Sequence, residues 1–306
     1  MKERDLGLSI FCHAVLIFAA LLVGLPLYFA FVAGSLSIQE VQQTPFPWLP
    51  GRYFFANVVE AWNTGDFARS FANSMIVTTG IVVGKLAISL IAAYAVTYFR
   101  FPFRMTAFWL IFVSLMLPVE VRIIPTYEAV ADTAGPIRWA LSSLGISGAI
   151  EALTGYQVDA YLQWNMVNTY SGLVLPLIAS ATATFFFRQF FMTVPDELVE
   201  AARIDGAGPL RFLWDVLIPL SRTNIAALFV ILFIYGWRQY LWPLMVSTEV
   251  RYQTIVLSIG RMMQAPEAAF EWPIIMATAL LALLPPVVVV VLMQRWFVKG
   301  LVETEK

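Results

Sequence analysis

The chain has 306 residues, of which 60% are hydrophobic and 13% are charged, and its mean hydropathy is +0.76. Because soluble domains are about 25% charged, this composition excludes an ordinary water-soluble domain. A formal net charge of −1 excludes a basic nucleic-acid binder. The single cysteine, Cys12, excludes an internal disulfide, and the single histidine, His13, excludes a His-rich metal site.

Apolar runs long enough to cross a hydrocarbon core of about 30 Å recur along the chain. They predict an all-α membrane protein with a single transmembrane domain over residues 1–306. The first run is too long for the apolar core of a signal peptide, so we expect a retained helix. Six transmembrane helices are expected, at roughly residues 10–34, 70–98, 105–127, 170–192, 224–248 and 273–297.

Basic residues in the connecting segments predict the orientation in the membrane. With the N-terminus in the cytoplasm, the inside segments hold 11 Lys and Arg residues and the outside loops hold 5. Both termini and the loop at residues 193–223 are therefore expected to be cytoplasmic. The polar loop at 35–69 and the Gly- and Ser-rich loop at 128–169 are expected outside.

The loop at 193–223 is polar but has a helix-forming pattern. Pro195 can begin a helix without losing a backbone hydrogen bond. The residues that follow it suit the positive end of a helix dipole: Asp196, Glu197 and Glu200. Four further residues share one helical face: Leu198, Ala201, Ala202 and Asp205. The two alanines make that face shallow, so another surface could approach it closely.

The same loop predicts a second short helix. Gly206 and Gly208 end the first helix, Pro209 begins the next, and Pro219 ends it before the following span. An apolar stripe is expected along this second helix: Leu210, Leu213, Trp214 and Leu217. The pattern predicts a helix–turn–helix along the membrane face. An amphipathic hairpin that lies at the interface without a protein partner has the same pattern.

The residues of this loop resemble a motif of the permease subunits of binding-protein-dependent ABC importers. That motif reads E-A-A-x3-G-x9-I-x-L-P, and this chain matches it with conservative changes at two apolar positions: Glu200, Ala201, Ala202, Gly206, Val216, Ile218 and Pro219. Asp205 matches the usual continuation before the glycine. The resemblance implies a type I importer permease fold in which this loop is the coupling helix that docks on an ATPase.

The resemblance also implies the partners and the location. We expect a second permease subunit in a heterodimer, two ATP-binding subunits and an extracytoplasmic substrate-binding protein, in the inner (plasma) membrane of a bacterium. Membrane lipid surrounds the assembly, and nucleic acid is not expected as a partner. The residues expected to couple to the ATPase are Glu200, Ala201, Ala202, Asp205, Gly206 and Pro219.

Segments along nearly the whole chain look similar to the permeases of sn-glycerol-3-phosphate importers within this family. The segments that carry this likeness are residues 115–122, 179–185 and 235–244. The likeness implies import of sn-glycerol-3-phosphate or related glycerophosphodiesters. A sugar or another polar solute carried by a permease of the same family is the alternative. The loop at 128–168 is longer than is usual in those permeases.

The sequence contains no nucleotide-binding or catalytic signature. Residues 80–86 mimic a phosphate-binding loop, but they are one residue short and lack the final Ser or Thr. Gly80 and Gly84 instead predict close helix packing. We therefore expect no enzyme activity, no metal and no cofactor in this chain, with ATP and Mg²⁺ bound by the partner ATPase.

Charged residues inside the spans are candidates for a substrate path, because each costs at least about 2.5–3.5 kcal/mol at mid-membrane. Arg122 is the first choice and Arg238 the second, since a guanidinium binds phosphate oxygens bidentately. Gln239 and Glu120 lie beside these arginines in the sequence, and Asn73 could face the path. The alternatives are a Glu120–Arg122 ion pair, an Arg238 that snorkels to the interface, and an Asn73 that caps a helix.

One further charged residue lies inside a span, and two other classes of protein are alternatives to this interpretation. Lys85 lies inside the second span, where snorkelling is the simpler explanation than substrate contact. A secondary transporter driven by an ion gradient usually shows inverted repeats and several acidic residues inside its spans, and this chain shows neither. A membrane enzyme is the least supported class, because no nucleophile is paired with a base.

Overall fold

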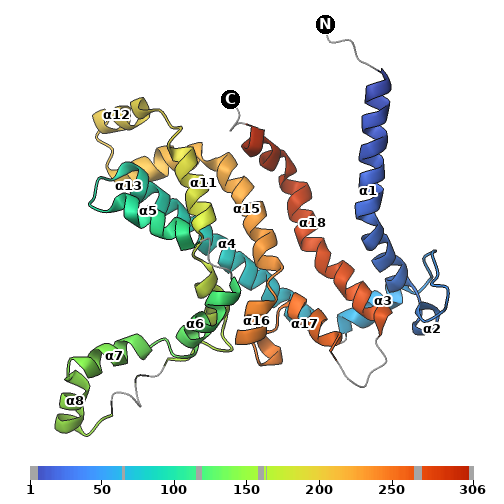
Figure 1. The fold of residues 1–306 in the computed structure, drawn as a ribbon, viewed down its shortest axis with the longest axis horizontal. Helices are drawn as coiled ribbons and strands as arrows, with labels where there is room; N and C mark the ends of the chain where they lie inside the picture. The colour runs from blue at the N-terminus through green and yellow to red at the C-terminus, as the bar shows by residue number, and fades with distance from the viewer. Residues whose placement is uncertain are drawn as a thin grey trace. The chain divides into compact units, whose positions relative to one another are not determined.

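The computed structural model describes residues 6–63, 66–114, 119–157, 162, 164–264 and 271–302, and within these ranges every regular element is helical. Figure 1 shows the helices in chain order. They form two compact units. One unit holds the residues up to Arg69 together with Ser258–Leu284, and the other holds Ser70–Leu257 together with the residues from Pro285 onward.

The first unit contains α1 (Leu6–Ser35), α2 (Ile38–Val41), α3 (Phe54–Asn63) and the first part of α18 (Trp272–Val302). Asn57 joins α3 to the end of α1, because its side-chain amide donates to the carbonyls of Gly34 and Leu36 at 2.9 Å each. Gly34 allows α1 and α18 to approach, since a Cβ there would lie 3.2 Å from Ala277 N.

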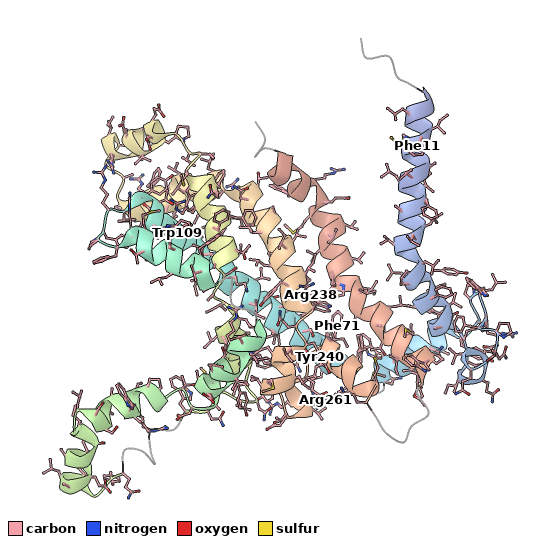
Figure 2. The ribbon with its side chains drawn as sticks, viewed as in Figure 1. Phe11, Phe71, Trp109, Arg238, Tyr240 and Arg261 are labelled. Atoms are coloured by element: carbon pink, nitrogen blue, oxygen red, sulfur yellow. The ribbon has the colours of Figure 1, made fainter. Side chains whose placement is uncertain are left out.

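Most of α1 presents apolar side chains to the outside. Phe11, labelled in Figure 2, is 66% exposed, and Leu21 is 69% exposed. Soluble proteins rarely expose contiguous apolar surface of this extent. The helix is 30 residues long, enough to cross a hydrocarbon core of about 30 Å, so lipid or another apolar partner covers this surface.

The second unit contains the longest described helix, α4 (Phe67–Tyr98), and most of the shorter elements. Its apolar core joins four helices through six buried residues: Val77, Ile81, Val130, Leu173, Trp242 and Val246. The elements after α4 are α5 (Arg104–Val113), α6 (Val119–Ala131), α7 (Gly135–Ser143), α8 (Ile146–Thr154), α10 (Tyr170–Val174), η2 (Leu175–Leu177), α11 (Ala181–Phe191), α12 (Asp196–Ile204), α13 (Pro209–Phe212), η3 (Leu213–Leu217), α14 (Ile218–Leu220), α15 (Arg222–Trp237), α16 (Leu241–Val246), η4 (Val250–Tyr252) and α17 (Ile255–Met262).

The predicted first, second and sixth spans are long apolar helices, α1, α4 and α18. The predicted fourth span is not one straight helix: α10 with η2 is bent by 46° from α11. Pro176 lies in η2 and has no N–H to continue a helical ladder, and Ser180 then begins α11 by accepting from Ala183 N. By length and composition the described residues hold three spanning helices, or up to five if each bent pair is one span.

The predicted third and fifth spans are also divided. The third corresponds to α5 and α6, with residues 115–118 outside the described part of the chain. The predicted fifth span at 224–248 breaks after Trp237 and continues as α16. Pro243 lies at the third position of α16, where its missing N–H causes no loss. These breaks leave backbone groups free, and such breaks occur in membranes where they line protein interior or a cavity.

The predicted loop at 128–169 contains the helical hairpin α7–α8, which Figure 1 shows projecting away from α6. Gly145 joins the two helices with φ of 71°, and Gly155 ends α8 with φ of 72°. Both are left-handed conformations that glycine adopts without a steric penalty. The sequence predicted a long Gly- and Ser-rich loop here, and these two glycines lie at the ends of helices.

Candidate functional site

The predicted coupling segment forms a separate helix, α12, between two defined ends. Pro195 precedes it, and Asp196 and Glu197 occupy its first turn. At the other end Gly206 adopts φ of 73°, while Ala207 N donates to Ala202 O at 2.8 Å and Gly206 N donates to Arg203 O at 3.0 Å. This pair of bonds is a Schellman motif. The predicted glycine stop is therefore confirmed at Gly206.

No residue of α12 is buried. A hollow of about 830 Å³ lies beside the helix, and α4, the turn after it and α13 contribute to its walls. Glu200 and Ala202 line the hollow, whereas Ala201 and Asp205 are exposed. The charged residues of the lining include both signs: Arg100, Arg104, Asp196, Glu200 and Arg203. The face with small residues is thus accessible, and the hollow next to it is polar.

The second helix of the loop differs from its prediction. Leu213 and Leu217 are buried, but Leu210 and Trp214 are 72% and 65% exposed. A π-helical turn, η3, follows α13 and contains the two buried leucines and Trp214. Phe212 is buried instead, and its ring centroid lies 5.6 Å from that of Tyr98.

The sequence predicted that Pro219 ends this helix, but the helical run continues for one more residue, to Leu220. Pro219 lies inside the short helix α14, near its start, where its missing N–H is tolerated. The chain turns one residue after α14, at Ser221, and the helical run Pro209–Leu220 is bent by 74° from α15. Pro219 is therefore part of the approach to the bend.

A second polar feature is a cavity of about 150 Å³ inside the second unit, which we call the cationic pocket. Its lining comes from α4, α6, η2 and the break after it, α15 and the turn that follows, and α16. The polar residues that line it are Lys85, Arg122, Thr126, Tyr235 and Gln239. Two residues proposed from the sequence, Arg122 and Gln239, are thus brought together although they are far apart in the chain.

Lys85 also lines this pocket, although the sequence favoured snorkelling over substrate contact for it. Its side chain does not snorkel, since the residue is only 6% exposed. Its ammonium donates to Ala179 O at 3.5 Å and lies 4.1 Å from the centroid of the Tyr235 ring. A cation over an aromatic ring in a desolvated place gains about 2 kcal/mol. Lys85 continues the buried row of Val77 and Ile81 at four-residue spacing, the signal that indicates its burial.

Gly80 and Gly84 position α4 against the broken helix, as their spacing predicted. A Cβ at Gly80 would lie 3.1 Å from Val174 Cγ1, and one at Gly84 would lie 2.8 Å from Ile178 Cβ. Because Gly84 precedes Lys85, this close approach brings the ammonium to the carbonyl of Ala179. Ser89, one turn further, donates to Ser180 O at 3.1 Å.

Arg238 and Asn73, two other predicted path residues, do not line the cationic pocket. Arg238 is exposed and follows the last residue of α15, as labelled in Figure 2. Asn73 is 1% exposed; its amide donates to Arg251 O and Gln253 O, and its carbonyl oxygen accepts from Tyr170 at 2.7 Å. Asn73 thus joins α4 to two other segments. The backbone of Glu120 belongs to α6, and its side chain lies outside the described residues.

Long apolar helices, broken helices and a cationic pocket that joins the buried Lys85 to the exposed Arg122 together define an integral membrane protein with a polar interior. A family model, the binding-protein-dependent transport system inner membrane component, matches residues 85–303. The chain belongs to this family of inner-membrane ABC transporter permeases, which are non-catalytic subunits.

Curated relatives match over the whole length. The chain is 48% identical over 312 residues to the sn-glycerol-3-phosphate transport system permease protein UgpE of Yersinia pestis, with 100% of both chains covered. It is 50% identical over 301 residues to the protein of the same name from Rhizobium meliloti, with 96% of both covered. A solved bacterial ABC transporter involved in the import of the polysaccharide alginate shares the fold, with a TM-score of 0.73, 20% identity, and coverage of 97% of this chain and 99% of that one.

Proposed function

We propose that this chain forms half of the translocation path of an ATP-driven importer for sn-glycerol-3-phosphate or related glycerophosphodiesters. The observation that carries the proposal is the full-length identity of 48–50% to permeases named for that substrate. The cationic pocket adds a physical reason, because Arg122 offers a guanidinium to the phosphate group and Gln239 offers hydrogen bonds. A neutral sugar can accept hydrogen bonds from these groups but lacks the charge–charge attraction to Arg122.

The proposal includes the partners that the family implies. A second permease completes the path, two ATP-binding subunits supply the energy, and an extracytoplasmic binding protein delivers the substrate. ATP and Mg²⁺ are held by the ATPase subunits, and both termini of this chain lie in the cytoplasm. Moving a conformational equilibrium from 1:99 to 99:1 needs about 5.5 kcal/mol, which ATP-driven closure of the partner could supply.

We assign the contact with the ATPase to α12 and its C-terminal turn. No residue of this helix is buried, and it carries the two small residues Ala201, which is exposed, and Ala202, which is half-buried. Glu200 lines the adjacent hollow, Asp205 follows the helix, and Gly206 closes it. An exposed helix of fixed length, anchored at both ends, can transmit a displacement of the partner to the helices that follow.

The experiment is transport by the purified complex in proteoliposomes, with loaded binding protein outside and ATP inside. We expect ATP-dependent uptake of sn-glycerol-3-phosphate that an ionophore does not abolish. Uptake of a neutral sugar in preference to the phosphate ester would contradict the substrate. Uptake driven by an ion gradient without ATP would contradict the mechanism.

The contact at α12 is tested in the same vesicles with the double variant Glu200→Ala and Gly206→Pro. We expect the complex to lose both transport and substrate-stimulated ATP hydrolysis, because the variant removes an exposed charge and the left-handed turn together. Unchanged transport and assembly would show that α12 is not the coupling element.

A further inference from the structure

Lys85 is a cation placed deep within the longest helix of the second unit. It lies about 20 Å from the nearer end of α4, at Tyr98, for a rise of about 1.5 Å per residue. Lysines of transmembrane helices reach the interface only when they lie near a helix end. With 6% exposure, the side chain remains in the protein interior, so its charge must be balanced there.

The described surroundings of Lys85 balance this charge only in part. An ammonium has three N–H donors, and one of them contacts Ala179 O at 3.5 Å, the long limit of a hydrogen bond. The Tyr235 ring contributes its electron-rich face. The ion pairs Arg69–Asp66, Arg138–Asp132 and Arg211–Asp215 all involve other residues. Donor capacity therefore remains at the cationic pocket.

The rest of the cationic pocket also favours a negatively charged ligand. Arg122 adds a second positive charge, and no described residue of the lining is acidic. The volume of about 150 Å³ is below the range of about 300–1,000 Å³ for drug-sized ligands. Two cations around a small space are complementary to a compact anion with two negative charges. A phosphate monoester carries about −1.5 to −2 at pH 7, whereas a diester carries a single charge.

We propose that Lys85 binds the phosphate group of the transported ester inside the membrane, with Arg122 as the second cation, and that this pair favours monoesters over diesters. The proposal rests on the proposed function and adds a residue and a charge preference to it. Gly80 and Gly84 serve the same site, because they let α4 approach the broken helix that holds Ala179. The depth of Lys85 within α4 distinguishes this site from one for a lipid headgroup.

The first test compares Lys85→Met with Lys85→Arg in the reconstituted complex. We expect Lys85→Met to lower monoester uptake at least tenfold and to lower diester uptake less, with assembly of the complex unchanged. Lys85→Arg keeps the charge and should retain the monoester preference. Arg69→Met is the matched control, since Arg69 is exposed and pairs with Asp66. An equal loss for both esters would overturn the proposal.

A chemical rescue keeps the test valid if Lys85→Met does not assemble. Cys12 is the single cysteine of the chain, so Lys85→Cys in a Cys12→Ser background gives one reactive thiol. Modification with an aminoethyl reagent restores a cation, whereas a methyl reagent of the same class does not. Monoester uptake restored only by the cationic reagent, and protection of the thiol by sn-glycerol-3-phosphate, are expected. Equal rescue by both reagents would contradict a role for the charge.

Glu120→Gln tests whether Lys85 merely pairs with a carboxylate of its own chain. If Lys85 binds substrate, Glu120→Gln should leave the monoester preference in place. If the two single variants and the double variant behave identically, the pair is structural and the proposal fails. A lipid headgroup could also supply the phosphate that Lys85 binds, so the effect of Lys85→Met is measured in vesicles with and without phosphatidylglycerol. A lipid site would make that effect depend on the lipid.

Wild-type uptake in the same assay tests the proposed function independently.

Discussion

The α12 segment and the cationic pocket are built in opposite ways. The proline before α12, its acidic first turn and the glycine that ends it all lie within the consecutive residues 195–206. The pocket collects residues from four separated segments. The Lys85 ammonium lies 4.1 Å from the centroid of the Tyr235 ring. Gln239 follows Tyr235 by one helical turn and donates to its carbonyl. A surface encoded locally can be altered by local changes, whereas the pocket depends on how the helices pack.

The largest expected effect tests the accessible face of α12. Ala201→Trp places a large ring on an exposed position of the proposed docking face. We expect ATP-driven uptake to fall at least about tenfold, equal to about 1.4 kcal/mol, because the partner can no longer approach closely. Co-purification of the ATPase subunit and uptake measure the effect.

A tryptophan elsewhere provides the control for Ala201→Trp. Gly148 lies on α8, and a Cβ there meets no atom within 4 Å. Gly148→Trp should leave co-purification of the ATPase unchanged. If Ala201→Trp also leaves co-purification of the ATPase unchanged, α12 is not the docking surface. The α12 segment would then not be a locally encoded functional surface that contrasts with the pocket.

The second effect tests the packing that forms the cationic pocket. Gly84→Val places side-chain atoms against Ile178, whose Cβ would lie 2.8 Å from the new Cβ. Overpacking of this kind costs about 1–3 kcal/mol. We expect a lower midpoint of thermal unfolding in detergent, together with loss of the monoester preference, because α4 is pushed away from Ala179.

Gly24→Val is the matched control for Gly84→Val, since a Cβ at Gly24 on α1 meets nothing within 4 Å. It should shift the midpoint of unfolding little. A stable Gly84→Val protein with an unchanged monoester preference would show that the close approach of the helices does not position Lys85.

The same contrast explains what could be predicted from the sequence. Contiguous patterns predicted the bounds of α12, the stop at Gly206 and the long helices α1, α4 and α18, since capping and apolar runs depend on nearby residues. Of the stripe predicted on the second short helix, Leu213 and Leu217 are buried, whereas Leu210 and Trp214 are exposed.

The pocket could be predicted only in part. Polar side chains inside apolar spans indicated Arg122 and Gln239, which line the same pocket in the structure. Lys85 was assigned to snorkelling because a single helix offers no sign of what lies opposite it. Its burial depends on the break after η2, which brings Ala179 to α4 from 94 residues further along the chain. Contacts of that separation leave no periodic signal in one sequence.

The smallest expected effect tests whether the stop of α12 depends on conformation alone. Gly206 and Gly208 both face open space, but Gly206 has φ of 73° and Gly208 has φ of −71°. An L-residue in the left-handed region costs about 1–2 kcal/mol. Gly206→Ala should therefore speed hydrogen exchange at the end of α12 by about fivefold or more, as this cost corresponds to a factor of that size. Gly208→Ala should leave exchange nearly unchanged, because alanine adopts its backbone conformation without strain.

Exchange measured by mass spectrometry on a peptide covering residues 196–207, corrected for intrinsic rates, separates the two variants. Equal exchange in both would mean that contacts outside the segment hold the turn, and α12 would then be no more locally encoded than the pocket.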